Sequence, residues 1–94
     1  MRALGVDLGS KRIGVAVSDR SGTIASPLVV VPRSKSRRRD HERLAELARE
    51  EEVERVVVGL PRSLSGELGP AATAVLSEIE VLATVVGVPV DPAG

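Results

Sequence analysis

Bulky apolar residues alternate with small ones along residues 3–18, and this alternation constrains the fold more than any other feature. It predicts one strand over about 3–8 and a second over about 12–18. Gly9 and Ser10 lie between the two runs and supply turn residues. The stretch therefore predicts an antiparallel hairpin with one bulky face and one nearly bare face. The bulky positions are Leu4, Val6, Leu8, Ile13, Val15 and Val17.

The bare face carries one carboxylate, Asp7, among small residues such as Gly5 and Gly14. Small side chains allow a large ligand or a closely packed helix to approach the backbone. An unpaired carboxylate is costly to bury. Asp7 is therefore either a functional residue or the ion-pair partner of Lys11 or Arg12.

The remaining chain alternates between strand and helix patterns. Residues 23–31 predict a third strand, in which Ser26-Pro27 indicates an edge position or a bulge. Residues 40–52 predict a helix with Asp40 as its N-cap and His41 exposed in its first turn. Residues 53–60 predict a strand whose run of three valines, 56–58, should be buried on both faces.

A second helix is predicted from Gly69 or Pro70, since proline fits the first helical position. Gly87 ends it, and a fifth strand begins at Val88 but is interrupted by Asp91 and Pro92. The order β-β-β-α-β-α-β, with three antiparallel strands first, is that of the ribonuclease H-like fold, an α/β fold with a mixed sheet. We expect one such domain over residues 1–94.

The composition excludes several classes of protein. The 94-residue chain has no cysteine, which excludes disulfides and thiolate metal sites and suits a cytoplasmic protein. No apolar run approaches the length that spans a membrane, so we expect no membrane partner. Without Phe, Tyr or Trp, aromatic stacking cannot contribute to any contact with nucleic-acid bases.

The charges are unevenly distributed along the chain. Residues 1–43 hold ten basic and four acidic side chains, a net charge of +6, and residues 44–94 hold three and nine, a net charge of −6. This asymmetry indicates either an anionic partner for the first half or two solvated faces of opposite charge. Phosphate contacts would give salt-sensitive, sequence-independent binding. The candidates are Ser10, Lys11, Arg12, Arg37, Arg38, Arg39 and Arg62, with Arg33 and Lys35 as extensions.

Three segments carry a family resemblance: GVDLGSKRIGVA at 5–16, VVVGLP at 56–61 with Ser65-Gly66 after it, and GVPV at 87–90. In this order they resemble the YqgF family of bacterial proteins, described as Holliday junction resolvase-like proteins or pre-16S rRNA nucleases. The resemblance implies a ribonuclease H-like fold, a cytoplasmic location and a metal-dependent phosphodiester hydrolase that trims the 5′ end of ribosomal RNA precursors. It implies Asp7 as the catalytic and metal-binding residue, Mg²⁺ or Mn²⁺ as cofactor, and RNA or another structured nucleic acid as partner.

The chain departs from the family pattern in two places. Ser65 replaces an aspartate often found before that loop's glycine. Family members continue after the GVPV segment to an Asp-Glu-Arg-Leu-Thr-Thr-like motif and a C-terminal helix with a further acidic residue, and Asp91 comes too early to take the place of either. We therefore expect a C-terminally truncated domain with an incomplete set of metal ligands, an incomplete or inactive form of the nuclease.

Two alternatives stay open at this point. The chain could be a non-catalytic nucleic-acid-binding remnant that keeps the basic surface. The Asp-x-Gly-Ser motif also resembles the first phosphate-binding loop of the actin, sugar-kinase and heat-shock ATPase superfamily, although a second domain and a second phosphate loop would not fit in this length. We further expect an exposed apolar sheet surface, with marginal stability or self-association.

Overall fold

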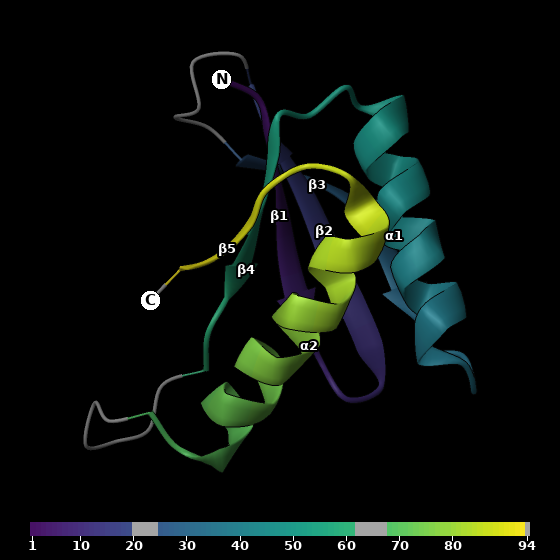
Figure 1. Ribbon diagram of the computed structural model, residues 1–94. Helices are drawn as coiled ribbons and strands as arrows, with labels where there is room; N and C mark the ends of the chain where they lie inside the picture. Colours follow the sequence, from purple (N-terminus) through teal and green to yellow (C-terminus); the bar gives the residue numbers. More distant parts are fainter. Residues whose placement is uncertain (20–24, 62–67, 94) are drawn as a thin grey trace.

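The computed structural model describes residues 1–19, 25–61 and 68–93. Five strands form one mixed sheet in the order β3-β2-β1-β4-β5, and two helices pack against it (Figure 1). The strands are β1 (Ala3–Leu8), β2 (Arg12–Ser18), β3 (Ala25–Pro32), β4 (Arg55–Gly59) and β5 (Val90–Ala93). The helices are α1 (Arg37–Glu50) and α2 (Pro70–Val86). The predicted order of elements is confirmed.

The first three strands pair antiparallel, and β4 and β5 join the sheet in parallel. In the β1–β2 hairpin Asp7 lies opposite Gly14, and Leu8 lies opposite Ile13. β4 pairs in parallel with β1, and β5 pairs in parallel with β4. The carboxyl ends of β1 and β4 therefore lie side by side, at the same end of the parallel strands.

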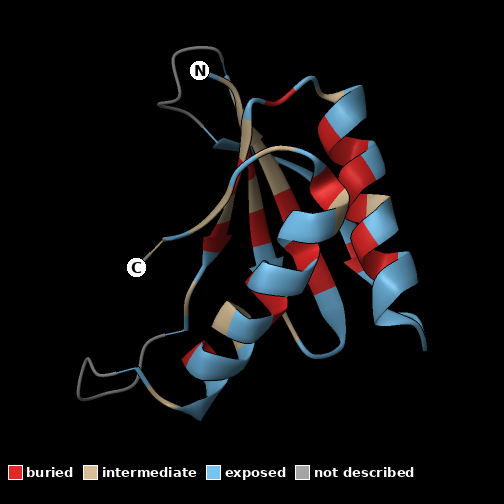
Figure 2. Ribbon diagram, viewed as in Figure 1, coloured by how far each residue is buried: buried red, intermediate tan, exposed pale blue. Residues whose placement is uncertain are grey.

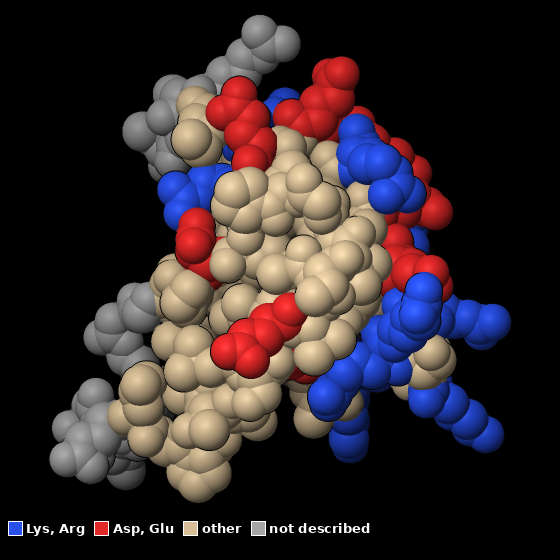
Figure 3. Space-filling model, viewed as in Figure 1, with Lys and Arg blue, Asp and Glu red and all other residues tan. Residues whose placement is uncertain are grey.

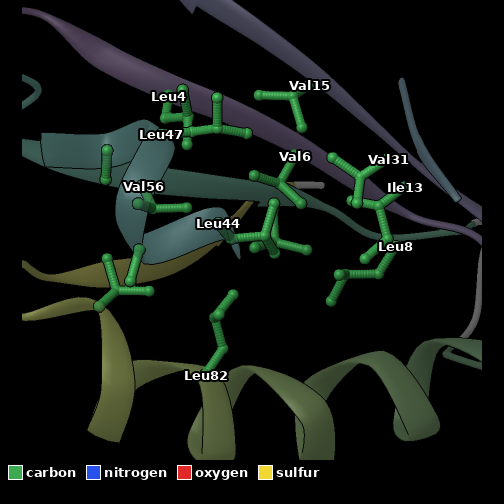
Figure 4. Close-up of a cluster of buried hydrophobic side chains, with 14 of the residues drawn as sticks. Leu4, Val6, Leu8, Ile13, Val15, Val31, Leu44, Leu47, Val56 and Leu82 are labelled. Atoms are coloured by element: carbon green, nitrogen blue, oxygen red, sulfur yellow. The ribbon is translucent and has the colours of Figure 1, made fainter. Parts of the chain in front are cut away.

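Both helices cover the same face of the sheet. Leu44 of α1 and Leu82 of α2 belong to one hydrophobic cluster with Leu4 and Val58 of the sheet (Figure 4). Each of these four side chains is at most 1% exposed. Buried residues line the helix-facing side of the strands, whereas the outward positions of β1, β2 and β4 are mostly of intermediate burial (Figure 2). The bulky face predicted for the hairpin is thus the core, and neither of the two described helices covers the bare face.

The prediction that β4 is buried on both faces is wrong. Val56 and Val58 are buried among the core residues, but Val57 points to the other face and is only partly buried. The reason is the two-layer arrangement, in which no described element covers the second face. The exposed apolar sheet surface that the sequence predicts is confirmed: Val30 is 58% exposed, and Gly5, Gly14 and Val57 line the same shallow hollow.

Helix α1 begins three residues earlier than predicted, so the N-cap assignment of Asp40 is wrong. Ser36 is the N-cap, and its hydroxyl accepts a hydrogen bond from the Arg39 amide at 3.2 Å. Asp40 lies inside the first turn and is buried, where it accepts a hydrogen bond from the Ser34 amide at 3.0 Å. A serine cap satisfies the first amides of the helix, so the helix can start within the arginine run.

The edge position and the bulge, predicted as alternatives for the third strand, are both present. β3 is an edge strand, and its pairing with β2 shifts register between Val15 and Ala16, beside Pro27. The predicted interruption of the fifth strand at Asp91 and Pro92 is wrong, because both residues lie inside β5. β5 is also an edge strand, a position that tolerates a proline.

Helix α2 follows the prediction closely. Gly69 is its N-cap, Pro70 its first residue, and Gly87 its C-cap with φ of 82°, a left-handed conformation that favours glycine. Within the described ranges, neither helix is long and apolar enough to cross a membrane. Arg62, the Ser65-Gly66 pair and the first part of the predicted third strand lie outside the described residues.

Candidate nucleic-acid interface

A pocket of about 580 Å³ lies where the carboxyl ends of β1 and β4 meet the first half of α2. Asp7, Gly9 and Ser10 line it from the hairpin, and Gly59 lines it from β4. Helix α2 contributes Ala71, Ala74, Val75 and Glu78. Ligands of open α/β sheets commonly bind outside the carboxyl ends of the strands, so this pocket is the candidate functional site.

Asp7 is exposed on the bare face of the sheet, as the alternation of the hairpin predicts. Gly14 lies directly opposite, and a Cβ there would lie 3.7 Å from the Asp7 Cβ. Arg12 occupies the diagonal position on the same face, within reach of a long side chain. The carboxylate therefore stands in open space beside one cation, and the structure contains no ion pair between the two.

The turn after Asp7 is tightly folded. The Gly9 amide donates a hydrogen bond to the Asp7 carbonyl at 3.0 Å. A Cβ on Gly9 would lie 2.5 Å from the Arg12 carbonyl oxygen, so only glycine fits without moving the backbone. This turn leaves Ser10, Lys11 and Arg12 exposed next to the carboxylate.

A second hollow of about 370 Å³ extends the site toward the start of α1. It shares Ser10, Arg33 and Arg37 with the first pocket and adds Lys35. Arg37, Arg38 and Arg39 are all exposed, and basic side chains gather at this end of α1 (Figure 3). The structure thus brings the predicted phosphate contacts of the turn and of the arginine run to neighbouring surfaces.

Sequence reasoning missed a buried charged cluster behind this surface. The Arg33 guanidinium forms a fork with Glu78, with N–O distances of 2.7 and 3.0 Å, and its Nε donates to the Gly9 carbonyl at 2.9 Å. His41 Nε2 lies 2.7 Å from Glu78 Oε2. The prediction that His41 is exposed is wrong, because its side chain is fully buried. Arg33, expected as a phosphate contact, is 16% exposed and already paired.

This cluster keeps Glu78 ionised. Burial of Glu78 raises its pKa, but hydrogen bonds from Arg33 and His41, with the charges of Arg33 and Arg37, outweigh burial and lower it to about 2. The hydrogen bond to Glu78 in turn raises the pKa of Arg33. Because an ionised carboxylate only accepts hydrogen bonds, His41 Nε2 carries the proton of this contact.

A signal for the cluster was present in the sequence. Glu78 follows Val75 by three positions and precedes Leu82 by four, so it falls on the apolar stripe of α2. His41 likewise precedes Leu44 by three positions. A charged residue on a buried stripe requires a buried partner, but the sequence does not identify Arg33 as that partner.

The described residues do not by themselves fit a Mg²⁺ site. They contain no group of three or more His, Cys, Asp or Glu side chains that could hold a metal ion. Asp7 offers one carboxylate, whereas Mg²⁺ requires near-octahedral oxygen coordination. Glu78 lines the same pocket, but both its oxygens are occupied by Arg33 and His41.

Comparison with known proteins relates this geometry to one family. The family model RuvX, described as Holliday junction resolvase, matches residues 1–94. A relative from Thermoanaerobacter pseudethanolicus is 43% identical over 96% of this chain and 64% of its own length. One from Nocardia farcinica is 51% identical over 86% of this chain and 48% of its own length. Both are named as candidate pre-16S rRNA nucleases, and the chain spans about half to two thirds of these curated relatives.

Solved structures agree on the fold. RuvC of Thermus thermophilus superposes with a TM-score of 0.66 at 26% identity, over all of this chain and 64% of that one. A hexokinase from the same organism gives 0.63 at 30% identity, but only a third of that chain, 33%, is covered. The likeness to RuvC supports the predicted ribonuclease H-like fold. With a match to the family model over its whole length, the chain belongs to the RuvX family of Holliday junction resolvase-like proteins, also known as the YqgF family.

Proposed function

We propose that this chain carries the nucleic-acid-binding surface and one catalytic carboxylate of a cytoplasmic nuclease that processes the 5′ end of the 16S rRNA precursor in ribosome biogenesis. One observation carries the proposal. Asp7 is an exposed carboxylate at the carboxyl end of a central strand. Exposed basic side chains lie on the turn that follows it and in the first turn of α1, where Arg37 lines the same pocket as Asp7. The names of the curated relatives support RNA as the substrate.

The proposed backbone contacts form two groups. Ser10, Lys11 and Arg12 lie on the turn next to Asp7, and the arginine run lies at the start of α1. The second group consists of Arg37, Arg38 and Arg39, with Arg62 as a further contact outside the described residues. The described members of both groups are exposed cations or hydroxyls of the kind that contact phosphates, so binding should depend on phosphate charge rather than on base sequence.

Asp7 is the proposed catalytic residue and one proposed ligand of a divalent cation, Mg²⁺ or Mn²⁺. When bound in a phosphodiesterase, such a cation polarises the phosphate and activates water. A single carboxylate does not complete that coordination, so the role argued for the described residues is limited to binding the substrate and holding Asp7 beside it.

A second candidate function follows from the lack of a metal-binding cluster among the described residues. A chain of residues 1–94 would then bind RNA without cutting it, as a non-catalytic binding module.

Binding is tested by fluorescence anisotropy of residues 1–94 with a 5′-extended 16S precursor fragment and with a four-way DNA junction. We expect affinity that falls steeply with salt. Lys11→Ala and Arg12→Ala should each reduce the log–log salt slope by about 0.7 to 0.9 per lost phosphate contact. Arg49→Ala, an exposed arginine at the far end of α1, is the matched control. Absence of RNA binding at low salt would contradict the proposed function.

The role of Asp7 is tested by the same assay with EDTA and with Mg²⁺. Removing a negative charge beside a phosphate should make Asp7→Asn bind more tightly than the native chain in EDTA. If Asp7 is a cation ligand, Mg²⁺ should strengthen binding by the native chain more than by the variant. An identical response of both proteins to Mg²⁺ would exclude Asp7 as a ligand.

Cleavage separates the two candidate functions. With Mg²⁺, we expect residues 1–94 to bind the precursor without detectable cleavage. Turnover that disappears in Asp7→Asn would overturn this expectation and establish the chain as a nuclease. Turnover of ATP would instead favour the kinase-like phosphate-binding alternative.

A further inference from the structure

The half-buried Arg33 joins two walls of the candidate site. Its Nε donates to the Gly9 carbonyl at 2.9 Å, on the turn that follows Asp7. Its two terminal nitrogens donate to Glu78 of α2 at 2.7 and 3.0 Å. One guanidinium therefore links the turn after Asp7 to the side of α2 that lines the pocket, and it fixes the distance between them.

The backbone of Arg33 anchors the same turn a second time. The Arg33 amide donates to the Lys11 carbonyl at 3.0 Å. The side chain and the main chain of one residue at the end of β3 thus hold Gly9 and Lys11, which flank Ser10. Ser10 lies between them with an exposed side chain, so these two hydrogen bonds set the position of its backbone.

Glu78 is fixed from the other side. His41 Nε2 of α1 donates to Glu78 Oε2 at 2.7 Å, the same oxygen that Arg33 Nη1 contacts. Asp40 adds a second carboxylate, with its Oδ2 4.0 Å from Arg33 Nη1. The guanidinium is therefore held by groups from both helices, and the turn is tied through it to the whole helical layer.

We propose that Arg33 is a positioning residue that holds the Gly9–Arg12 turn in the conformation that presents Ser10, Lys11 and Arg12 to a nucleic-acid backbone, without itself contacting phosphate. The inference deepens the proposed function and rests on it for the identity of the ligand. A planar fork with a separate Nε–H can satisfy the carbonyl and the carboxylate together, which a lysine ammonium on a flexible stem does not reproduce.

Arg33→Lys is the informative variant, because it keeps the charge and removes the fork. The ordering of the turn is measured first, without ligand, from backbone amide order parameters of residues 10 and 11 in the 1–94 chain. We expect these to fall in Arg33→Lys and in Glu78→Gln, and to stay unchanged in Arg43→Lys, a matched change on the exposed side of α1. Unchanged order parameters in Arg33→Lys would overturn the proposal whether or not RNA binds.

RNA affinity and its salt dependence are measured next with the precursor fragment. We expect Arg33→Lys to bind roughly three- to tenfold more weakly, since a preorganised turn becomes mobile, with a log–log salt slope equal to that of the native chain. A slope lower by about 0.7 in Arg33→Ala would mean that Arg33 itself contacts phosphate and would overturn the proposal. Should Arg33→Lys not fold, Glu78→Gln takes its place in both measurements.

Discussion

His41 and Glu78 lie 37 positions apart on different helices and meet at 2.7 Å, with the imidazole fully buried. The contact joins α1 to α2 at the only place where the described core contains paired charges. Burying charge is costly unless it is paired and hydrogen-bonded. The cluster therefore makes the packing of the helices depend on the ionisation of Glu78.

Stability should fall in acid because of Glu78. Its pKa is lowered from 4.5 to about 2 in the folded chain. A folded-state pKa below the unfolded value favours folding above about pH 4.5 and loses that contribution as the pH falls toward 2. The contribution is on the order of 3 kcal/mol. Urea midpoints measured from pH 7 to pH 2 check this expectation.

Glu78→Gln should remove most of that pH dependence while lowering the stability at pH 7, because Arg33 loses its partner. Glu80→Gln, an exposed change two positions along α2, serves as the control and should follow the native curve. A Glu78→Gln curve that kept the native acid transition would assign the effect to other carboxylates.

The turn after Asp7 should not tolerate an added methyl group. A Cβ on Gly9 would approach the Arg12 carbonyl oxygen to 2.5 Å, so Gly9→Ala must displace the turn backbone. Overpacking of this kind costs about 1–3 kcal/mol, and RNA affinity should fall with it. Gly59 lines the same pocket, and no atom lies within 4 Å of a Cβ added there. Gly59→Ala should therefore change the stability and the RNA affinity little. Thermal melts and anisotropy of both variants test the contrast.

Removing the cap of α1 should weaken the helix that carries the arginine run. Ser36→Ala deletes the hydroxyl that accepts from the Arg39 amide, and such a loss costs about 1 kcal/mol. Ser77→Ala, on the exposed side of α2, should change the melting temperature little. Equal melting temperatures for the two variants would show that the cap contributes nothing measurable.

The uncovered sheet face should promote self-association. It presents Val30, at 58% exposure, beside Gly5, Ala16 and Val57, and patches of this kind are typical of contact surfaces. We expect the 1–94 chain to associate with rising concentration in sedimentation velocity, and Val30→Lys to shift it toward the monomer. Val81→Lys, at 50% exposure on α2, is the control. A native chain that stays monomeric at all concentrations and unfolds in one sharp transition would contradict this prediction.

The elements set by local pattern could be predicted from the sequence, and those set by long-range contacts could not. The hairpin and α2 followed from periodicity, and Gly87 and Pro70 marked the ends of α2 correctly. The start of α1 was misplaced because the arginine run resembled a loop, whereas the cap came from Ser36. Ser36 was a possible N-cap in the sequence, but Asp40 belongs to an equally favoured N-cap residue type, so the sequence did not decide between them.

The candidate site divides in the same way. Alternation alone placed Asp7 on the bare face, and the turn residues beside it followed from adjacency. The Arg33–Glu78–His41 cluster joins three elements through side chains that lie at least 37 positions from Glu78. Periodicity could mark Glu78 and His41 as buried, but only the tertiary fold, which places Arg33 after the end of β3 against Glu78 of α2, brings Arg33 to them.

The charge pattern of α1 has a consequence for how binding and folding are linked. Its first turn holds three arginines and its last residues run into Glu50, Glu51 and Glu52, so most charges at both ends oppose the helix dipole. The helix is thus stabilised by docking rather than by its own electrostatics. A polyanion bound at the first turn of α1 would reduce the unfavourable interaction between the arginines and the helix dipole. If phosphate binds at this end of α1 as proposed, binding would therefore also raise the free energy of unfolding of the chain by mass action, because the polyanion would bind the folded chain only.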